Sequence, residues 1–468
     1  MNAAGYRYGA ADQAFYLPSV LDAINRQLYP RDDAVLSAQG ALMVSDDIIA
    51  TITRASGVSV PVLFLGGYLL SVLTLFGAGA AFARALGQSW WGAALLTAIL
   101  TLRHRIPKTG VNTLEGHFHP RILAFSVGIA AAALFLRGRT APALAVVAVA
   151  GIIHPTIGVW FGCWIVIAAI VADPQARSWL TGTAAIAASG AAVMTLGPMR
   201  HRLTPMDEAW LSVIAGKDYL FPADWRLDVW LLNLAAPAIV LMVYRRRRRR
   251  SAATPPELGL VIGAVALLAL FLIAVPLTVA HIALAVQLQV SRIFWLIEFA
   301  AIAYLVAELD ALQRRAAKIL LGVVVLASCA RGWYVMRVEH PGRPVWQVQL
   351  PNDAWHDAMR WIAARRGYDA VLTDPGHAFR YGTSVRVAAQ RDVYLEEVKD
   401  AALAIYSRDV ALRVRERTDA LGHYDALTPS HALMLARRYD LRYLVSAVPV
   451  DMPEVYRNDR FHVYDLKR

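Results

Sequence analysis

Four short segments place ionisable side chains beside or within apolar runs, and these are where chemistry is expected in this chain. Charged groups are expensive to bury at membrane depth, so those that occur there usually bind a ligand or take part in a reaction. The four segments are YGAADQ at residues 8–13, EGHFHPR at residues 115–121, the pair His154-Pro155, and Arg292 in the apolar run 290–309.

Most of these segments also have a purely structural explanation. Asp12 and His154 each stand where a residue could cap a helix, His154 beside a proline. Glu115, His117 and His119 are residue types that bind metals, but one residue between the two histidines does not put both on one helical face. The sequence therefore indicates neither a metal site nor a cofactor, although a divalent metal is compatible with it.

Arg292 needs a partner of opposite charge within its apolar surroundings. Glu298 is six residues further along the chain, which puts the two side chains on different faces of a helix. They are therefore not an obvious helical ion pair, and the expected partner of Arg292 is an anionic ligand.

The composition shows what kind of scaffold must position these residues. Of the 468 residues, 57% are hydrophobic and only 18% are charged, and the mean hydropathy is +0.43. These values exclude an ordinary soluble protein, a disordered chain and a collagen-like chain. The two cysteines, Cys163 and Cys329, lie inside apolar runs, so neither a disulfide framework nor a cysteine metal site is expected.

Ten apolar segments are expected to cross a membrane. Two of them, residues 90–102 and 141–153, are short for a straight crossing, which needs about 20 residues. The other eight are residues 60–83, 122–136, 155–171, 179–197, 227–244, 258–280, 290–309 and 319–336.

The distribution of the net charge of +12 tests this count. Residues 340–468 hold 19 Lys and Arg against 17 Asp and Glu, so the excess lies between the apolar segments, where residues 245–250 are all arginine. Lys and Arg accumulate in cytoplasmic loops. With ten crossings and the arginine run inside, every tight basic turn falls on that side. This pattern favours an orientation signal over a nucleic-acid or lipid-headgroup patch.

The same orientation puts residues 1–57, 103–121, 198–226 and the tail from about residue 338 on the outer face. That face then carries four basic residues near the membrane, against the usual rule: Arg103, Arg105, Lys108 and Arg121. A phosphate or pyrophosphate headgroup explains them, because the guanidinium fork matches phosphate oxygens. The alternative is that residues 90–102 do not cross, which leaves these side chains inside.

The outer N-terminal segment is expected to contain two short amphipathic helices that lie along the membrane surface or pack on neighbouring helices. Pro18 suits the first position of one helix, and Ser45 suits the cap of the other. No apolar run precedes this outer segment, so we expect one more membrane helix upstream in the natural chain.

Residues 339–468 are expected to form a small α/β domain. Helical spacing occurs at residues 353–366, near 393–421 and at 430–438, and strands are expected at 370–373, 385–388, 442–445 and 461–464. The predicted fold class is therefore an α-helical polytopic membrane protein with a C-terminal soluble α/β domain. Its predicted parts are an outer first loop at 1–57, a transmembrane domain at 58–338 and the outer domain at 339–468.

This layout and the motifs together resemble the GT-C superfamily of membrane glycosyltransferases. The shared layout is an early acid in an outer first loop, many membrane helices of unequal length, and a C-terminal outer domain. The motifs are similar to those of uncharacterised bacterial polytopic proteins near that superfamily: YRYGAADQAFYLPSVLDAINRQLYPRD at 6–32, EGHFHPR at 115–121, HPT at 154–156 and SRIFW at 291–295.

The resemblance implies transfer of a sugar, a hexose or a pentose, from a polyprenyl-phosphate donor to an envelope acceptor outside the bacterial inner membrane. Asp12 matches the position of the acid that acts in that superfamily as the base for the acceptor. Arg292 and Arg121 would hold the donor phosphate. The other residues expected to line the site are Tyr8, Gln13, Glu115, His117, His119 and His154.

Two other functions are compatible with the sequence. A transporter or flippase for a lipid-linked or anionic solute fits Arg292 and Glu298 in one apolar run, but the two halves show no internal repeat. A non-catalytic envelope-assembly protein fits the lack of an evident second acid beside Asp12. The partners expected are membrane lipid and a lipid-linked sugar donor, and nucleic acid is not among them.

Overall fold

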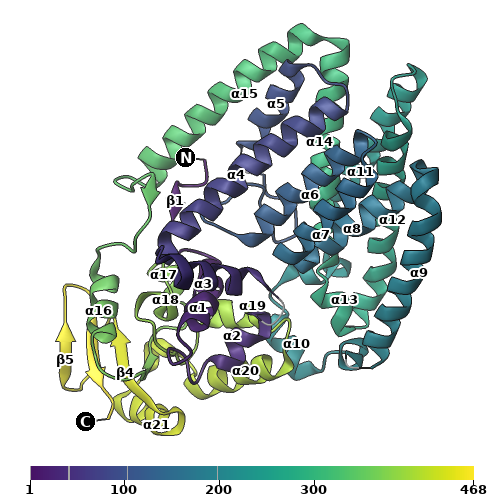
Figure 1. Ribbon diagram of the computed structural model, residues 1–468. Helices are drawn as coiled ribbons and strands as arrows, with labels where there is room; N and C mark the ends of the chain where they lie inside the picture. Colours follow the sequence, from purple (N-terminus) through teal and green to yellow (C-terminus); the bar gives the residue numbers. More distant parts are fainter. Residues whose placement is uncertain (1, 41–42, 103, 198, 468) are drawn as a thin grey trace. The chain divides into compact units, whose positions relative to one another are not determined.

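The computed structural model describes residues 2–40, 43–102, 104–197 and 199–467, and it divides into two compact units (Figure 1). The first unit comprises residues 1–5, 67–206 and 217–345, and the second comprises residues 6–66, 207–216 and 346–468. The N-terminal segment and the C-terminal tail therefore belong to the same unit, although they lie at opposite ends of the sequence.

Long apolar helices make up most of the first unit. Within the described ranges, six segments are helical, long and apolar enough to cross a membrane. A helix of 26 residues such as α4 is about 39 Å long, more than the roughly 30 Å of a bilayer core. The six are α4 (Val60–Ala85), α8 (Pro155–Ala172), α11 (Leu227–Arg249), α12 (Pro255–Val279), α13 with α14 (Ala283–Gln287 and Ile293–Leu312), and α15 (Arg314–Tyr334) with η5 (Val335–Glu339).

The other expected spans are also helical: α5 (Trp90–Leu100), α6 (Pro120–Leu136), α7 (Thr140–Ile153) and α9 (Pro174–Leu196). That all ten segments cross the membrane stays a prediction. Short turns of helix connect the long ones: η1 (Arg200–Leu203), η2 (Asp218–Leu220), η3 (Pro222–Asp224) and η4 (Val290–Arg292).

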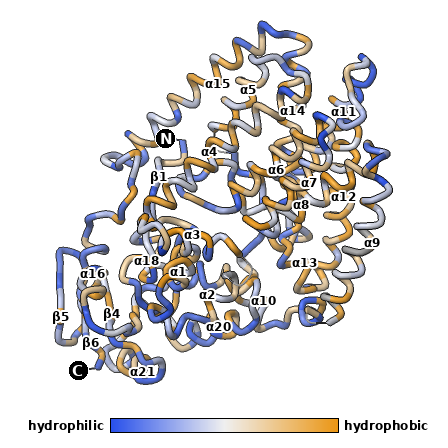
Figure 2. Tube along the Cα trace, in the orientation of Figure 1, coloured by the Kyte–Doolittle hydropathy of each residue, from blue (hydrophilic) through white to orange (hydrophobic). Residues whose placement is uncertain are grey.

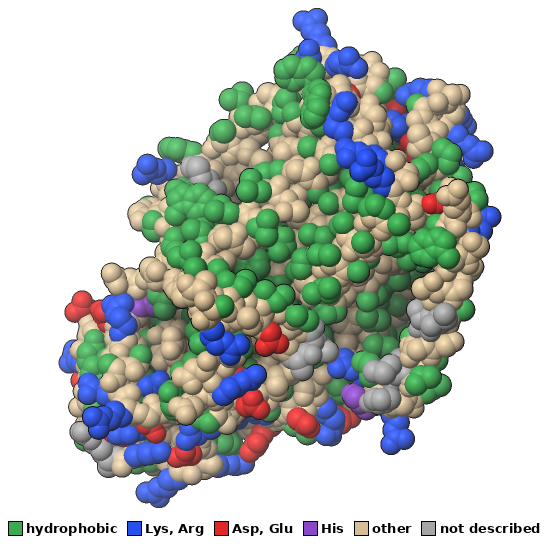
Figure 3. Space-filling view, viewed as in Figure 1, with side chains coloured by type: hydrophobic (Ala, Val, Ile, Leu, Met, Phe, Trp, Pro, Cys, Tyr) green, Lys and Arg blue, Asp and Glu red, His purple; other side chains and the backbone are tan. Residues whose placement is uncertain are grey.

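The outer helices of the first unit turn apolar side chains away from the protein. Trp295 and Tyr304 of α14 are buried, whereas Leu73 of α4 is 69% exposed and Leu326 of α15 is 71% exposed. Figures 2 and 3 show apolar residues along these helices and over the surface that they form. Continuous apolar surface of this kind requires a lipid environment. The chain is an integral membrane protein.

The basic turns between the helices meet at one end of the first unit, as the charge pattern predicts. Arg137, after α6, donates from Nη2 to the carbonyl of Ala81 in α4 at 3.3 Å. Arg247, near the end of α11, donates from Nη2 to the carbonyl of Leu86, just after α4, at 2.9 Å. The turns after α4, α6 and α11 are therefore neighbours.

The second unit combines small sheets with short helices. In the four-stranded sheet the order is β3-β4-β6-β5, with β3 and β4 parallel and the other neighbours antiparallel. Trp355, Val371, Tyr443 and Val463 are buried in the core beside it. The strands are β1 (Tyr6–Arg7), β2 (Trp346–Gln347), β3 (Ala370–Leu372), β4 (Leu441–Ser446), β5 (Glu454–Arg457) and β6 (His462–Asp465).

Two helices of this unit, α16 (Ala354–Ala363) and α21 (Pro429–Tyr439), contact that sheet, and most of the N-terminal segment is also helical. β1 lies parallel to β2, with Tyr6 opposite Trp346, so the start of the chain joins the C-terminal part by backbone hydrogen bonds. The other helices are α1 (Gln13–Ile24), α2 (Asp33–Gly40), α3 (Ser45–Ser56), α10 (Glu208–Ile214), α17 (His377–Arg380), α18 (Val385–Ala388), α19 (Glu397–Leu403), α20 (Arg408–Leu421) and η6 (Tyr424–Ala426).

The predicted strands at 370–373, 442–445 and 461–464 are confirmed, but the one at 385–388 is wrong. These residues form α18 because the Ser384 hydroxyl accepts from the backbone N–H of Arg386 at 3.1 Å and caps a helical turn. The helical stretch expected near 393–421 is divided into α19 and α20, and β5 was not expected.

Both expected N-terminal helices exist, but their first residues differ from the prediction. Pro18 lies inside α1, which begins at Gln13, because the backbone N–H groups of Gln13 and Ala14 already form turn hydrogen bonds. Ser45 is the first residue of α3 rather than its cap. α1 is largely buried, whereas α3 exposes Ile48 by 47%, so only α3 offers an apolar face outward.

A buried ion cluster ties the N-terminal segment to the C-terminal part. The Arg386 guanidinium donates from Nε to Asp32 at 2.7 Å and from Nη1 and Nη2 to Asp400 at 2.6 and 3.1 Å. Each of these three side chains is at most 1% exposed. Arg413 also pairs with Asp32. Buried charges are tolerated only when paired in this way.

Candidate functional site

The run EGHFHPR leads into the first turn of α6. The His119 side chain caps this helix, since its Nδ1 accepts from the backbone N–H of Arg121 at 3.2 Å. The Arg121 Nη2 donates to Glu115 Oε1 at 3.1 Å, and the Nε2 of His117 lies 3.6 Å from Glu115 Oε2. These four side chains are each at most 9% exposed.

α8 begins in a similar way at His154. The imidazole Nδ1 accepts from the backbone N–H of Ile157 at 3.5 Å, and Pro155 is the first helical residue. The expected cap at His154 is therefore confirmed. Because Nδ1 accepts this hydrogen bond, Nε2 is assigned as the nitrogen that carries the proton and can donate it.

Arg292 stands at the beginning of α14. The apolar run is interrupted here: Gln289 has a left-handed backbone (φ 49°), and the Ser291 hydroxyl donates to a carbonyl in η2 at 2.8 Å. Glu298 lies in the second turn of α14, and its carboxylate is 3.8 Å from the Nδ1 of His104. The two charged residues of this run therefore do not pair with each other along the helix.

Electrostatic interactions show that these helix beginnings are neighbours. His154 lies in the turn between α7 and α8, outside both helices. Burial, and after it the positive charges of Arg292, His119 and Arg121, hold the pKa of the His154 imidazole well below its usual range. We call Glu115, His117, His119, Arg121, His154 and Arg292 the basic cluster.

Aromatic packing holds the three helices in place just beyond the basic cluster. Phe125, one turn into α6, stacks on Trp295 of α14 with ring centroids 3.7 Å apart. It also meets Phe161 of α8 edge-on at 5.8 Å. The Trp295 indole donates to Thr113 Oγ1 at 3.3 Å. The first turns of α6, α8 and α14 are thus fixed by large side chains that leave little freedom.

The basic cluster has the chemistry of an anion site. The N-terminus of a helix carries about half a positive charge, and three helices begin here. Arg121 and Arg292 add two guanidinium groups that match phosphate oxygens. Among the described residues, no group of three or more His, Cys, Asp and Glu side chains is placed to hold a metal ion.

The other predicted site residues lie in the second unit, at the turn before α1. The Asp12 side chain makes no cap hydrogen bond, and its Oδ1 accepts from the Nζ of Lys399 at 2.8 Å. It is 35% exposed, as an acid that meets a substrate must be. Gln13 is completely buried, and its Oε1 accepts from the backbone N–H of Gly9 at 2.7 Å, so it holds the turn.

Gly9 and Tyr8 shape the surface beside this turn. Gly9 has φ +79°, and a Cβ there would lie 2.7 Å from Leu350, so only glycine fits. Burial raises the pKa of the Tyr8 phenol. Tyr8 lines a cavity of about 360 Å³ together with Leu21, Val60, Pro61, Gln349, Leu350, Val387 and Gln390.

The structure thus gathers six of the nine predicted residues in the first unit and three in the second. Of the outer basic residues, Lys108 pairs with Asp218, and Arg103 lies outside the described residues. Lys399 was missed by sequence reasoning, because nothing in a sequence without relatives links it to a residue almost 400 positions earlier.

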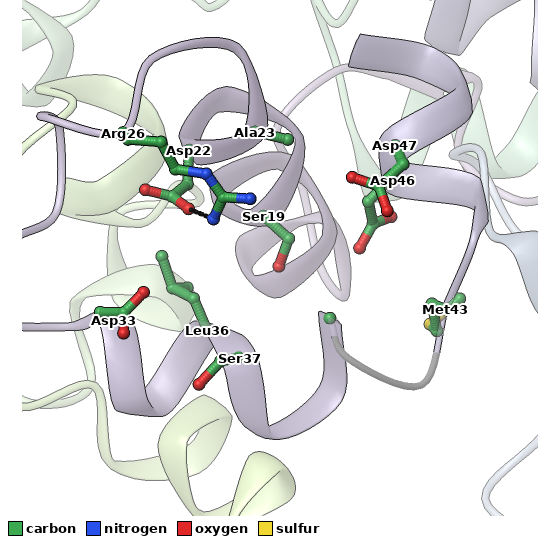
Figure 4. A pocket seen from close by; sticks show the side chains of 11 residues that line it. Ser19, Asp22, Ala23, Arg26, Asp33, Leu36, Ser37, Met43, Asp46 and Asp47 are labelled. Atoms are coloured by element: carbon green, nitrogen blue, oxygen red, sulfur yellow. Dashed lines mark hydrogen bonds and ion pairs between the residues drawn. The ribbon is translucent and has the colours of Figure 1, made fainter. Parts of the chain in front are cut away.

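Sequence reasoning also missed an acidic cavity of about 240 Å³ among α1, α2 and α3 (Figure 4). Its lining includes four aspartates, and Arg26 pairs with Asp22 at 2.7 Å. Asp46 is the aspartate of this cavity whose pKa is shifted most clearly, because burial raises it to about 7. The four aspartates are Asp22, Asp33, Asp46 and Asp47.

We expect Asp46→Asn to stabilise the protein more at pH 8 than at pH 5. The raised pKa means that the folded state favours the protonated acid, so the stability it contributes is complete below about pH 4 and lost as the pH rises through 7. Thermal unfolding in detergent at both pH values measures the difference from wild type. Asp47→Asn, an exposed neighbour, is the control and should give the same small difference at both. Equal behaviour of the two variants would contradict the assignment.

Comparison with known proteins gives matches in structure alone. No protein-family model and no curated protein sequence matches the chain. Solved structures of an archaeal oligosaccharyltransferase, AglB from Archaeoglobus fulgidus, are among those that it resembles. AglB itself is a GT-C superfamily glycosyltransferase.

Two of these AglB structures show how similar the chain is in fold and in sequence. A crystal structure tethered to an acceptor peptide containing the NVT sequon has a TM-score of 0.42 and 12% identity, over 95% of this chain and 66% of AglB. A complex with an inhibitory peptide and a dolichol-phosphate has a TM-score of 0.40 and 13% identity, over 94% and 66%. The chain thus spans just under two thirds of AglB. At this level of similarity the activity has to be inferred from the chain's own side chains.

Proposed function

We propose that the protein is a GT-C-like glycosyltransferase that moves a hexose or pentose from a polyprenyl-phosphate donor to an envelope acceptor. The reaction would take place at the outer face of a bacterial inner membrane, with the C-terminal domain on that side. The observation that supports the proposal best is the basic cluster, where two arginines and the N-termini of three helices are buried together.

The cluster suits the leaving group of this reaction. When the bond between the sugar and the phosphate breaks, the polyprenyl phosphate departs with an added negative charge. Arg121, Arg292 and the helix N-termini of α6, α8 and α14 would stabilise that charge, because they are held in place before the reaction begins. Glu115 would keep the Arg121 guanidinium oriented through their hydrogen bond, and the Nε2–H of His154 could donate to a phosphate oxygen.

The acceptor side of the reaction needs a base. An acceptor hydroxyl or amide attacks the anomeric carbon and loses its proton as the new glycosidic bond forms. We assign this proton to the Asp12 carboxylate, following the motif match in the sequence. The partly exposed position of Asp12 on the turn before α1 supports this role.

Native mass spectrometry of the detergent-purified protein tests the proposal. We expect the wild-type protein to carry a polyprenyl phosphate or its glycosylated form, and Arg292→Ala to retain at least tenfold less, because a charge-assisted contact with phosphate is lost. Arg331→Ala is the matched control, since Arg331 is exposed in the same unit and pairs with Glu339 at 2.8 Å.

The outcome also separates the proposal from transport. If neither sample holds such a lipid, even after one is added, the glycosyltransferase assignment fails. If the lipid binds but the protein tolerates Asp12→Asn far better than Arg292→Ala, a lipid transporter becomes the better explanation.

A further inference from the structure

The end of the first unit that holds the basic turns has several arginines that are exposed, in addition to those that form its internal ion pairs. In the run 245–250, Arg247 is 8% exposed and donates from Nε to Glu257 at 2.8 Å. Arg250 pairs with Glu308 at 3.0 Å through both terminal nitrogens. These two arginines hold α11, α12 and α14 together. Arg245, Arg248 and Arg249 have exposed side chains.

Two exposed tryptophans lie at the same end, at the beginning of α5. Trp90 is 72% exposed and Trp91 is 48% exposed. Each ring carries a cation over its face: the Arg84 guanidinium lies 4.7 Å from the Trp90 ring centre, and the Lys318 ammonium lies 4.8 Å from that of Trp91. Tryptophan prefers the boundary between lipid and water, with its ring in contact with both.

Hydrogen bonds show that the arginine run and the two tryptophans lie on one continuous surface. Ser89, which caps α5, donates from Oγ to Asp310 of α14 at 2.6 Å, and Arg247 donates to the carbonyl of Leu86 at 2.9 Å. The turn between α4 and α5 thus contacts the ends of α11 and α14. Figure 3 shows basic side chains gathered at this end of the long helices. The exposed members are Arg84, Arg245, Arg248, Arg249, Arg314, Arg315 and Lys318, with Trp90 and Trp91.

The charge pattern alone favours an orientation signal, but the exposed tryptophans with cations over their rings add a second role. We propose that this surface also binds the phosphodiester headgroups of anionic phospholipids. A cation fixed over an exposed tryptophan places positive charge at the depth where lipid phosphates lie. The arrangement suits a lipid rather than free phosphate, because the two rings need the acyl boundary beside the headgroup. The inference is independent of the proposed sugar transfer.

Titration of the full-length protein with phosphatidylglycerol and with phosphatidylcholine, followed by native mass spectrometry, tests the proposal. We expect wild type to bind phosphatidylglycerol more tightly, and the pair Arg84→Gln with Lys318→Gln to bind it about 30-fold more weakly, since each interfacial charge contributes about a factor of five. The control pair is Arg366→Gln with Arg437→Gln, which removes two exposed charges from the second unit.

A second variant, Trp90→Leu with Trp91→Leu, keeps both cations but removes their aromatic support, and it should bind phosphatidylglycerol several-fold more weakly. Thermal unfolding confirms that each variant is folded. The proposal is overturned if wild type binds both lipids equally, if the control pair loses as much affinity as the Arg84 and Lys318 pair, or if millimolar inorganic phosphate displaces the lipid.

Discussion

Asp12→Asn is expected to lower the rate of sugar transfer at least 100-fold and to leave the donor lipid bound. The amide has nearly the shape of the carboxylate but cannot take the acceptor proton, and loss of a general base typically costs a factor of about 10² to 10⁴. Transfer of labelled sugar from lipid-linked donors in membranes measures the rate. Native mass spectrometry of the same variant measures the retained donor.

The ion pair with Lys399 provides the matched control for this prediction. Lys399→Met removes the partner of Asp12 but keeps the carboxylate, so it should reduce transfer far less than Asp12→Asn. If Asp12 serves only to hold Lys399 and the turn before α1, the two variants will lose activity equally. Equal losses would therefore refute the assignment of Asp12 as the base.

Arg386→Met is expected to destabilise the second unit by about 3–5 kcal/mol, the usual cost of leaving buried charges without their partner. Removal of the Arg386 guanidinium would leave the Asp400 carboxylate without this partner and Asp32 with Arg413, in a region from which water is excluded. Hydrogen exchange is the suitable measurement, because it reports opening of α2, α18 and α19 separately from the membrane helices.

Arg442→Met is the control for this variant. Arg442 also pairs with two acids, Asp369 and Asp465, but its side chain is 37% exposed. Exposed pairs contribute about 0–1 kcal/mol. A similar rise in exchange in both variants would mean that the buried ion cluster is not what holds the N-terminal segment to the C-terminal part.

The membrane helices could be predicted from the sequence because each depends on nearby residues. An apolar run that is long enough to cross a bilayer must be helical to satisfy its own backbone hydrogen bonds. The basic turns follow from the same local charge pattern, and Arg137 and Arg247 do lie at one end of the helices. The strands β3, β4 and β6 were equally visible as short β-branched and aromatic runs.

The errors occurred where side-chain hydrogen bonds override the pattern of residue types. Residues 385–388 have the alternation of a strand, yet they form a helical turn that Ser384 caps, and Arg386 of this turn reaches Asp32 and Asp400. Pro18 lies inside α1 rather than at its first position, because the helix begins at the turn that Gln13 closes through its hydrogen bond with the Gly9 N–H. In both cases the competing hydrogen bonds are invisible to a pattern of residue types.

The sequence by itself determined the apolar helices, the gathering of their basic turns at one end, and the residue types able to bind phosphate or take a proton. The tertiary structure alone decided which of these meet. It brings Arg121, His154 and Arg292 together, because α6, α8 and α14 pack through Phe125, Phe161 and Trp295. It also pairs Asp12 with Lys399. Such contacts depend on the folding of distant segments, which local patterns do not encode.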